Sequence, residues 1–371
     1  MNELSDKILP KKSIQSLVSY RPQVKEEINS NQIRLSVNEG ALGIGPKAKN
    51  AIKNWNENFT HNFHRYPFQI NVNLVEAISK RYKLISENII PGNGSDELIQ
   101  LLCHAFLEKN DEAIFTQYGF LVFPQAIKIS GGIPVKAKDK NFTVCIKEII
   151  NKINNKTKII FIANPNNPTG TMVPEKDLRE LIKHTPKNIL IVIDSAYAEY
   201  VLDKDYCDGS ILVQENNNVV MLRTFSKIHG LASFRLGWAY CSDYVASILK
   251  SIRAPFSVNS LASHVGSAAI QDTDFEKISV TNNQKLMKWT HKKLKSLNIK
   301  ILPSVANFFL IDLNSEDEVN KLVKYLESKN IFVREMKPYN LSSFIRVSIG
   351  NEKEMKIFCD EFSIFLNKKR L

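Results

Sequence analysis

The sequence predicts an α/β protein with a mostly parallel sheet covered by helices on both faces, followed by a smaller α+β domain. Continuous apolar runs are typical of strands that are buried on both faces, and helical patterns separate these runs. The alternation continues across residues 46–272. The chain of 371 residues also exceeds the length that one hydrophobic core normally supports, so two domains are expected.

Three regions are expected along the chain. Residues 1–45 form an N-terminal arm that joins the small domain, residues 46–272 form the large domain, and residues 273–371 form the small domain. The helical pattern from Phe275 to Leu297 connects the two domains. The strands expected in the small domain cover residues 308–312, 331–334 and 344–348, and its other helices cover residues 316–326 and the C-terminal stretch.

Polar side chains follow two of the apolar runs in the large domain. The run 189–193 ends at Asp194, and Tyr197 lies three residues later. The run 159–163 is followed by a turn-rich segment that contains Asn167. Taken alone, an aspartate here can be a helix cap and an asparagine can belong to a simple turn. Ligands of open α/β sheets bind outside the carboxyl ends of the strands, so the groups together indicate a ligand site.

The most informative segment is residues 223–235, which follows another apolar run. It places Lys227 directly after Ser226, with Arg235 eight positions further on. A lysine amine can form a Schiff base with an aldehyde, and a hydroxyl and a guanidinium can bind a phosphate. Pyridoxal 5'-phosphate (PLP) carries both an aldehyde and a phosphate. A surface lysine in a basic loop is the alternative, and the groups at the other strand ends argue against it.

The strand-end side chains have matching roles toward PLP. Asp194 can pair with the protonated pyridine nitrogen and keep the ring an electron sink. Tyr197 and Asn167 can hydrogen-bond the phenolic oxygen of the ring. Tyr118 follows the short strand 113–115 and could stack on the ring, although a tyrosine in the core or at the rim is the plain alternative.

A second phosphate-binding element is expected where residues 92–97 lead into a helical pattern. The backbone amides of Gly94, Ser95 and Asp96, together with the positive end of the helix, form a natural phosphate seat. The segment is not a dinucleotide fingerprint, because Glu97 stands where a third glycine is required.

In this order, the segments resemble the fold-type I PLP-dependent aminotransferases, and within them most closely the histidinol-phosphate aminotransferases. The resemblance extends over nearly the whole chain, from residues 35–39 to residues 345–350. It is highly specific for PLP enzymes and less specific for the substrate. The matching segments between these ends are residues 65–67, 92–97, 164–170, 194–197, 223–235, 253–256, 306–308 and 333–334.

The resemblance implies a seven-stranded, mostly parallel sheet in the large domain and a role for each matching residue. Lys227 would form the Schiff base and carry the proton between the substrate's α-carbon and C4' of the cofactor. Tyr66 would reach the phosphate held by a neighbouring subunit, so a homodimer with shared active sites is expected. The residues implied to bind the cofactor within one chain are Gly94, Ser95, Asp96, Tyr118, Asn167, Asp194, Tyr197, Thr224, Ser226, Lys227 and Arg235. Those implied to bind the substrate are Arg346, Arg334, Asn307, Tyr20 and Asn38.

The expected activity is transamination of L-histidinol phosphate with 2-oxoglutarate, a step of histidine biosynthesis. Both substrates are anions that can use the bidentate fork of Arg346. Two alternatives keep the fold: an aromatic amino-acid aminotransferase, which differs in the side-chain pocket, and a decarboxylase of a phosphorylated amino acid. A regulatory domain without chemistry is disfavoured because Lys227 and Asp194 are both present.

Composition argues against several other classes of protein. The net charge is +12, but the lysines are spread over polar faces, so a solvated surface and no nucleic-acid partner are expected. No apolar run approaches the roughly 18 residues of a membrane span, and the N-terminus lacks a signal-peptide layout, so no membrane association is expected. The five cysteines have no paired spacing, which favours the reducing cytoplasm. His61 and His64 have no companion ligands that would complete a metal site.

Overall fold

Seven strands form the main sheet of the described part of the chain, in the order β2-β8-β7-β6-β5-β3-β4. The computed structural model describes residues 11–15, 17, 32–58, 64–67 and 70–370. All neighbouring strands are parallel except at β8, which runs antiparallel to both β2 and β7. The sheet confirms the predicted fold class. In sheet order, the strands are β2 (Ile89–Gly92), β8 (Gly237–Tyr240), β7 (Val219–Thr224), β6 (Leu190–Asp194), β5 (Thr157–Ala163), β3 (Glu112–Thr116) and β4 (Ile133–Ala137).

Helices cover both faces of this sheet because successive strand residues point to opposite faces and both sets are apolar. In β6, Ile191 and Ile193 pack into the core on one face, whereas Leu190 and Val192 pack into the core on the other. The first core receives α1 (Pro46–Asn58), α2 (Ile70–Tyr82), α5 (Ile146–Ile150), α6 (Glu175–His184), α7 (Ser210–Glu215) and α9 (Ser260–Ala269). The second receives α3 (Ser95–Phe106), α4 (Val122–Ser130) and α8 (Asp243–Ile252).

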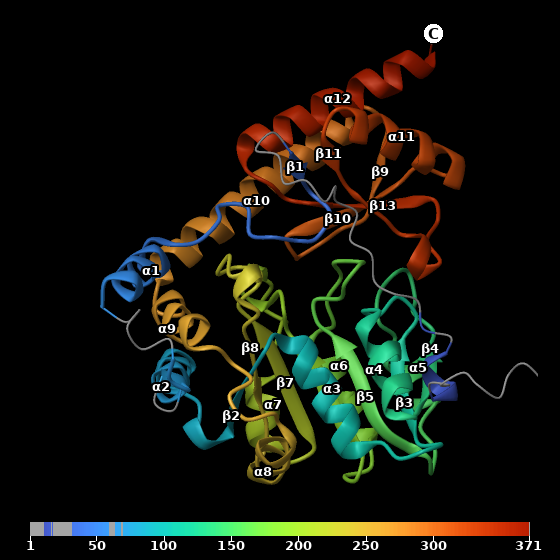
Figure 1. Cartoon of the computed structure of the whole chain (residues 1–371). Coiled ribbons are helices and arrows are strands. Elements are labelled where there is room, and N and C mark those ends of the chain that lie inside the picture. Colours follow the sequence, from blue (N-terminus) through green and yellow to red (C-terminus); the bar gives the residue numbers. More distant parts are fainter. Residues whose placement is uncertain (1–10, 16, 18–31, 59–63, 68–69, 371) are drawn as a thin grey trace, which may run out of the picture.

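A smaller body is built on a four-stranded antiparallel sheet with the strand order β12-β13-β10-β9. Helix α10 (Thr273–Lys295) extends from the larger body to the smaller one (Figure 1). The strands of this sheet are β12 (Arg334–Glu335), β13 (Phe344–Ser348), β10 (Phe308–Asp312) and β9 (Lys300–Ile301), and helices α11 (Glu316–Ser328) and α12 (Glu352–Arg370) pack on it. Short 3-10 helices cover Lys12–Ile14 (η1), Ser86–Asn88 (η3), Ala198–Tyr200 (η4), Ala232–Phe234 (η5) and Lys337–Tyr339 (η6).

The prediction of one strand over residues 331–334 is wrong. β11 (Ile331–Phe332) pairs in parallel with β1 (Ile33–Arg34), and only the next residues, in β12, join the four-stranded sheet. The backbone partner of β11 lies about 300 positions earlier in the chain, and a local sequence pattern carries no signal of such a partner. The pairing attaches residues 33–34 to the smaller body. The domain limits at residues 45 and 272 stay predictions.

The fold brings the ends of three parallel strands to one cavity. Ala163, Asp194 and Thr224 are the last residues of β5, β6 and β7, and all three line this cavity. Arg334 and Arg346 line it from the smaller body. Within the described ranges, no helix is both long enough and apolar enough to cross a membrane.

Candidate active site

The cavity lies between the carboxyl edge of the main sheet and the smaller body. Its volume is about 450 Å³, within the roughly 300–1,000 Å³ that is usual for small-molecule sites. The strand ends supply polar groups, while Phe120, Leu121 and Val122 at the start of α4 supply an apolar wall. A ligand of cofactor size with polar and aromatic parts therefore suits the cavity.

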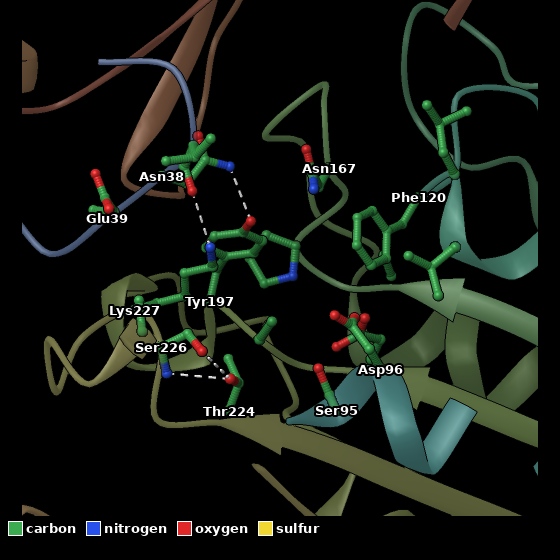
Figure 2. Close-up of a pocket in the computed structure, with 18 of the residues that line it drawn as sticks. Asn38, Glu39, Ser95, Asp96, Phe120, Asn167, Tyr197, Thr224, Ser226 and Lys227 are labelled. Atoms are coloured by element: carbon green, nitrogen blue, oxygen red, sulfur yellow. Dashed lines mark hydrogen bonds between the residues drawn. The ribbon is translucent and has the colours of Figure 1, made fainter. Parts of the chain in front are cut away.

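Lys227 is the amine of this cavity (Figure 2). Its Nζ atom donates a hydrogen bond to the carbonyl oxygen of Val37 at 3.1 Å. Burial lowers the pKa of Lys227 to about 8, and the positive charge of Arg346 acts in the same direction. Because the neutral amine is the nucleophile, this environment activates Lys227 for bonding to an aldehyde.

Capture of PLP by the cofactor-free protein is therefore expected to accelerate as the pH rises from 6 and to level off above about pH 8.5, since Lys227 loses its proton with a pKa of about 8. The measurement is the rate at which visible absorbance appears after mixing with PLP at each pH. A rate that keeps rising toward pH 10, as for an ordinary lysine, would contradict this assignment.

Asp194 ends β6 with a buried carboxylate, and its Oδ1 atom has no hydrogen-bond partner in the described part of the chain. Burial raises the pKa of Asp194 to about 7, and the nearby charge of Asp96 raises it further, whereas the backbone N–H of Ala196 opposes the shift. A cationic N–H placed against Oδ1 would satisfy this atom and favour the ionised carboxylate. The site therefore fits a protonated pyridine nitrogen.

Tyr197, Asn38 and Asn167 form a polar group next to Lys227. The Nδ2 atom of Asn38 donates to the hydroxyl of Tyr197 at 2.9 Å (Figure 2). Asn38 has a positive φ of 58°, a backbone conformation in which asparagine is enriched. Arg346 donates to Oδ1 of Asn167. The Nδ2 group of Asn167 is therefore oriented as a donor that can bind a ligand. These donors match an anionic oxygen such as the phenolic oxygen of PLP.

An anion cradle is built where β7 meets the start of α3. The Oγ1 atom of Thr224 bonds to Oγ of Ser226 at 3.0 Å, and Nη1 of Arg235 donates to the same Ser226 oxygen at 3.5 Å. Ser95 begins α3 after Gly94, whose φ is 82°. This positive φ favours glycine, and a Cβ at Gly94 would also lie 2.8 Å from Nη2 of Arg235. Hydroxyls, a guanidinium and a helix N-terminus together fit a phosphate.

Tyr118 is not among the residues that line this cavity, and its predicted stacking role stays a prediction. Its ring stacks on Phe142 with centroids 5.7 Å apart, and it packs with Leu302 and Leu310 outside the cavity lining. The turn after β3 brings Phe120 into the lining instead. We therefore assign the ring-stacking role to Phe120 as a proposal. Both aromatic residues lie in the same turn, and the sequence does not show which one the turn directs inward.

Asn307 does not line the cavity either. Its Nδ2 atom donates to the carbonyl oxygens of Asn38 and Glu39, at 3.2 and 3.3 Å, so it supports the cavity wall from behind. Tyr66 is 71% exposed, its ring stacks on Phe256, and it does not line the cavity of its own chain. Tyr20 lies outside the described residues.

Arg346 and Arg334 are buried side chains that line the cavity opposite the strand ends. Nη2 of Arg346 donates to the carbonyl oxygen of Ser36 at 2.7 Å, and its guanidinium lies 5.3 Å from the ring centroid of Phe308. These contacts hold the guanidinium in one orientation. Two buried cations in one cavity favour an anionic substrate.

Comparisons with known proteins agree with this geometry. The model of the family "Aminotransferase class I and II" matches residues 30–362, and the chain belongs to this family. It is 40% identical to the histidinol-phosphate aminotransferase of Pelagibacter ubique over 339 residues, which cover 91% of this chain and 93% of the relative. It is 38% identical to that of Maricaulis maris over 362 residues, with 97% and 99% covered.

Solved structures show the same fold. The histidinol-phosphate aminotransferase from Sinorhizobium meliloti, in complex with pyridoxal-5'-phosphate, superposes with a TM-score of 0.87 at 23% identity, over 96% of this chain and 97% of that chain. The histidinol-phosphate aminotransferase from Clostridium acetobutylicum gives a TM-score of 0.82 at 23% identity, with 91% and 99% covered. Both confirm the fold type that the sequence predicts.

Proposed function

We propose that this protein is a PLP-dependent aminotransferase that transfers the amino group of L-histidinol phosphate to 2-oxoglutarate. The observation that carries the proposal is the single cavity that combines Lys227, the carboxylate of Asp194 and two buried arginines. The similarity to histidinol-phosphate aminotransferases over nearly the full chain, at 38–40% identity, supports this amino donor and a role in histidine biosynthesis.

When bound, PLP supplies an aldehyde that bonds to amines and a ring that withdraws electrons from the substrate's α-carbon. Lys227 would bond to this aldehyde, and as a free amine it would move a proton to and from the α-carbon. Asp194 would keep the pyridine nitrogen protonated. Tyr197 and Asn167 would hold the phenolic oxygen, and Phe120 would pack against the ring.

The anion cradle would hold the phosphate of PLP. Ser226, Thr224 and Arg235 contribute side chains, and the backbone amides of Ser95 and Asp96 contribute the positive end of α3. Arg346 and Arg334 then bind the anionic end of each substrate in turn. The same guanidinium fork serves the phosphate ester of the donor and a carboxylate of 2-oxoglutarate.

Replacing Arg346 by lysine is expected to raise KM for both substrates by about tenfold or more, because a charge-assisted hydrogen bond contributes about 1.5–3 kcal/mol. Lysine keeps the charge but loses the bidentate fork, and kcat should fall as positioning suffers. Steady-state kinetics measure this, with the visible absorbance of bound PLP as the control for an intact cofactor site. Unchanged kinetics toward both substrates would place the anion elsewhere, with Arg334 the first position to test.

A homodimer with shared active sites is part of the proposal. Tyr66 supports it, because this aromatic side chain is exposed on its own chain and stacks on Phe256, which is itself 36% exposed. Large aromatic groups at a surface are common where two chains meet. In the dimer, Tyr66 would reach the PLP phosphate of the partner.

Mixing a Lys227→Ala variant with a Tyr66→Ala variant under conditions of subunit exchange is therefore expected to restore part of the activity. Each mixed dimer has one site that carries both an intact lysine and an intact tyrosine. The activity of the mixture is compared with that of each variant alone. A fully active monomer in sedimentation would defeat the shared site.

A cytoplasmic location completes the proposal. All five cysteines are free thiols. Burial raises the pKa values of Cys103, Cys241 and Cys359 to about 12, so these thiols are poorly reactive. Unpaired, unreactive cysteines suit a reducing compartment.

The amino donor is tested by kcat/KM values for L-histidinol phosphate, phenylalanine and tyrosine, each with 2-oxoglutarate. The kcat/KM value for histidinol phosphate should be higher by about tenfold to a hundredfold, because a charge-assisted hydrogen bond to its phosphate contributes about 1.5–3 kcal/mol. A preference for phenylalanine or tyrosine would favour an aromatic amino-acid aminotransferase instead.

A further inference from the structure

A second and much smaller cavity lies behind the active site. Its volume is about 10 Å³, which is about the least that holds one water molecule. It is enclosed by α10, by Tyr200 in η4, by the segment 40–43 and by the residue that precedes β10. The segment 40–43 directly follows Glu39 of the active-site lining, and α10 is the helix that connects the two bodies.

Four polar side chains line this small cavity. Tyr200 hydrogen-bonds to the side chain of Asn307, and each of the other three residues has an atom without a hydrogen-bond partner in the described part of the chain. The atoms are Oγ of Ser279, Oδ1 of Asn283 and Oδ1 of Asn307. Their residues are only 8%, 6% and 2% exposed. Ser279 and Asn283 are four residues apart on α10, so they share one face of the helix.

The orientation of both asparagines is set by the bonds that their other atoms make. Nδ2 of Asn283 donates to the carbonyl oxygen of Ala306 at 3.2 Å, and Nδ2 of Asn307 donates to the carbonyls of Asn38 and Glu39. Both Oδ1 atoms are therefore acceptors that need a donor, and the hydroxyl of Ser279 can donate a hydrogen bond. Buried polar groups of this kind nearly always find a partner.

We infer that this cavity binds one ordered water molecule, which donates to Oδ1 of Asn283 and Oδ1 of Asn307 and accepts from the hydroxyl of Ser279. Water offers two donors and accepts a bond, as these three atoms require. The ten lining residues, all of them described, include no carboxylate and no cation, so a charged ligand would lack a counter-charge.

Asn307 connects this water to the active site. The same amide group supports the backbone of Asn38 and Glu39, and Asn38 in turn donates to the Tyr197 hydroxyl. The segment also packs closely on the lysine loop, because a Cβ at Gly40 would lie 2.7 Å from the carbonyl oxygen of Lys227. The water-filled cluster thus positions the cavity wall at residues 38–39, and Asn307, Asn283 and Ser279 are positioning residues.

A high-resolution crystal structure of the PLP-loaded protein tests the site directly. We expect one water peak at about 2.7–3.2 Å from all three atoms. No peak, or side chains rotated so that the three polar atoms bond to one another, would overturn the inference. This result does not depend on which amino donor the enzyme uses.

Steady-state kinetics of variants in the small cavity test the positioning role. This second experiment rests on the proposed function. Asn283→Leu and the milder Ser279→Ala should each raise KM for histidinol phosphate, by about threefold to tenfold for the loss of one or two hydrogen bonds, with the absorbance of bound PLP unchanged. Thr290→Val is the matched control: Thr290 lies on the same helix and is fully buried, but it does not line the cavity.

The crystal structure and the kinetics together distinguish a failure of the water site, of the positioning role and of the proposed function. A water peak combined with an unchanged KM in both variants would overturn the positioning role. An equal rise of KM in Thr290→Val would do the same, because it would show a general effect of changes in α10. A protein that binds the water but does not use histidinol phosphate would contradict the proposed function and leave the water site intact.

Discussion

Replacing Lys227 by alanine is expected to abolish both the visible absorbance of the lysine-bound cofactor and transamination. Lys227 is the amine of the active-site cavity, and burial lowers its pKa to about 8. Roughly a tenth of the amine is therefore neutral and nucleophilic at pH 7, far more than for an ordinary lysine. In the proposed mechanism the same amine also moves the proton at the substrate's α-carbon. Loss of a positioned general acid–base group costs up to about 10⁴-fold in rate, and the loss of covalent attachment adds to this.

The measurement combines an absorbance spectrum with steady-state turnover. Lys204→Ala, at an exposed lysine in the loop after η4, is a suitable control and should retain both the spectrum and the activity. A circular dichroism spectrum equal to that of the parent would show that Lys227→Ala still folds. If Lys227→Ala kept turnover near the parental rate, another group would have to carry the proton.

The second large effect is expected at Asp194. Asp194→Asn should still bind PLP but lose roughly a thousandfold in kcat, which corresponds to about 4 kcal/mol in the barrier. Asparagine has nearly the same shape but no charge, so it cannot stabilise a protonated pyridine nitrogen. Burial raises the pKa of Asp194 to about 7, and the charge of Asp96 raises it further, so a cation placed against this carboxylate would stabilise its ionised form.

A second carboxylate provides the control for this prediction. Burial also raises the pKa of Asp139, to about 6, but Asp139 accepts a hydrogen bond from the backbone of Tyr118 and does not line the cavity. Asp139→Asn should therefore turn over within a few-fold of the parent. If Asp194→Asn behaved in the same way, Asp194 would not be the partner of the ring nitrogen.

The main sheet and the strand-end residues could be predicted because their signals are local. Continuous apolar runs give buried strands, and the residue after each run lies at the carboxyl edge, where parallel strands place their ligands. Asp194 and Thr224 end β6 and β7 in the structure, and Ser226 and Lys227 follow directly. These side chains meet in one cavity because three neighbouring strands run in the same direction.

The remaining features depend on contacts between distant parts of the chain. The split of residues 331–334 between two sheets follows from pairing with β1. The direction of the turn after β3 decides that Phe120, and not Tyr118, lines the cavity. Asn307 lies behind the cavity because its amide bonds to the backbone of residues 38–39. None of these partners is visible from the spacing of residues along the sequence.

The central claim is that this cavity binds PLP through Lys227, and borohydride trapping tests it most directly. Borohydride reduces the bond between PLP and its lysine to a stable form, and peptide mapping by mass spectrometry then identifies the labelled residue. The account predicts label on the peptide that contains Lys227, at about one equivalent per chain, since one cavity combines the amine with the anion cradle. Label on a different lysine, or no label on a protein that is active, would contradict it.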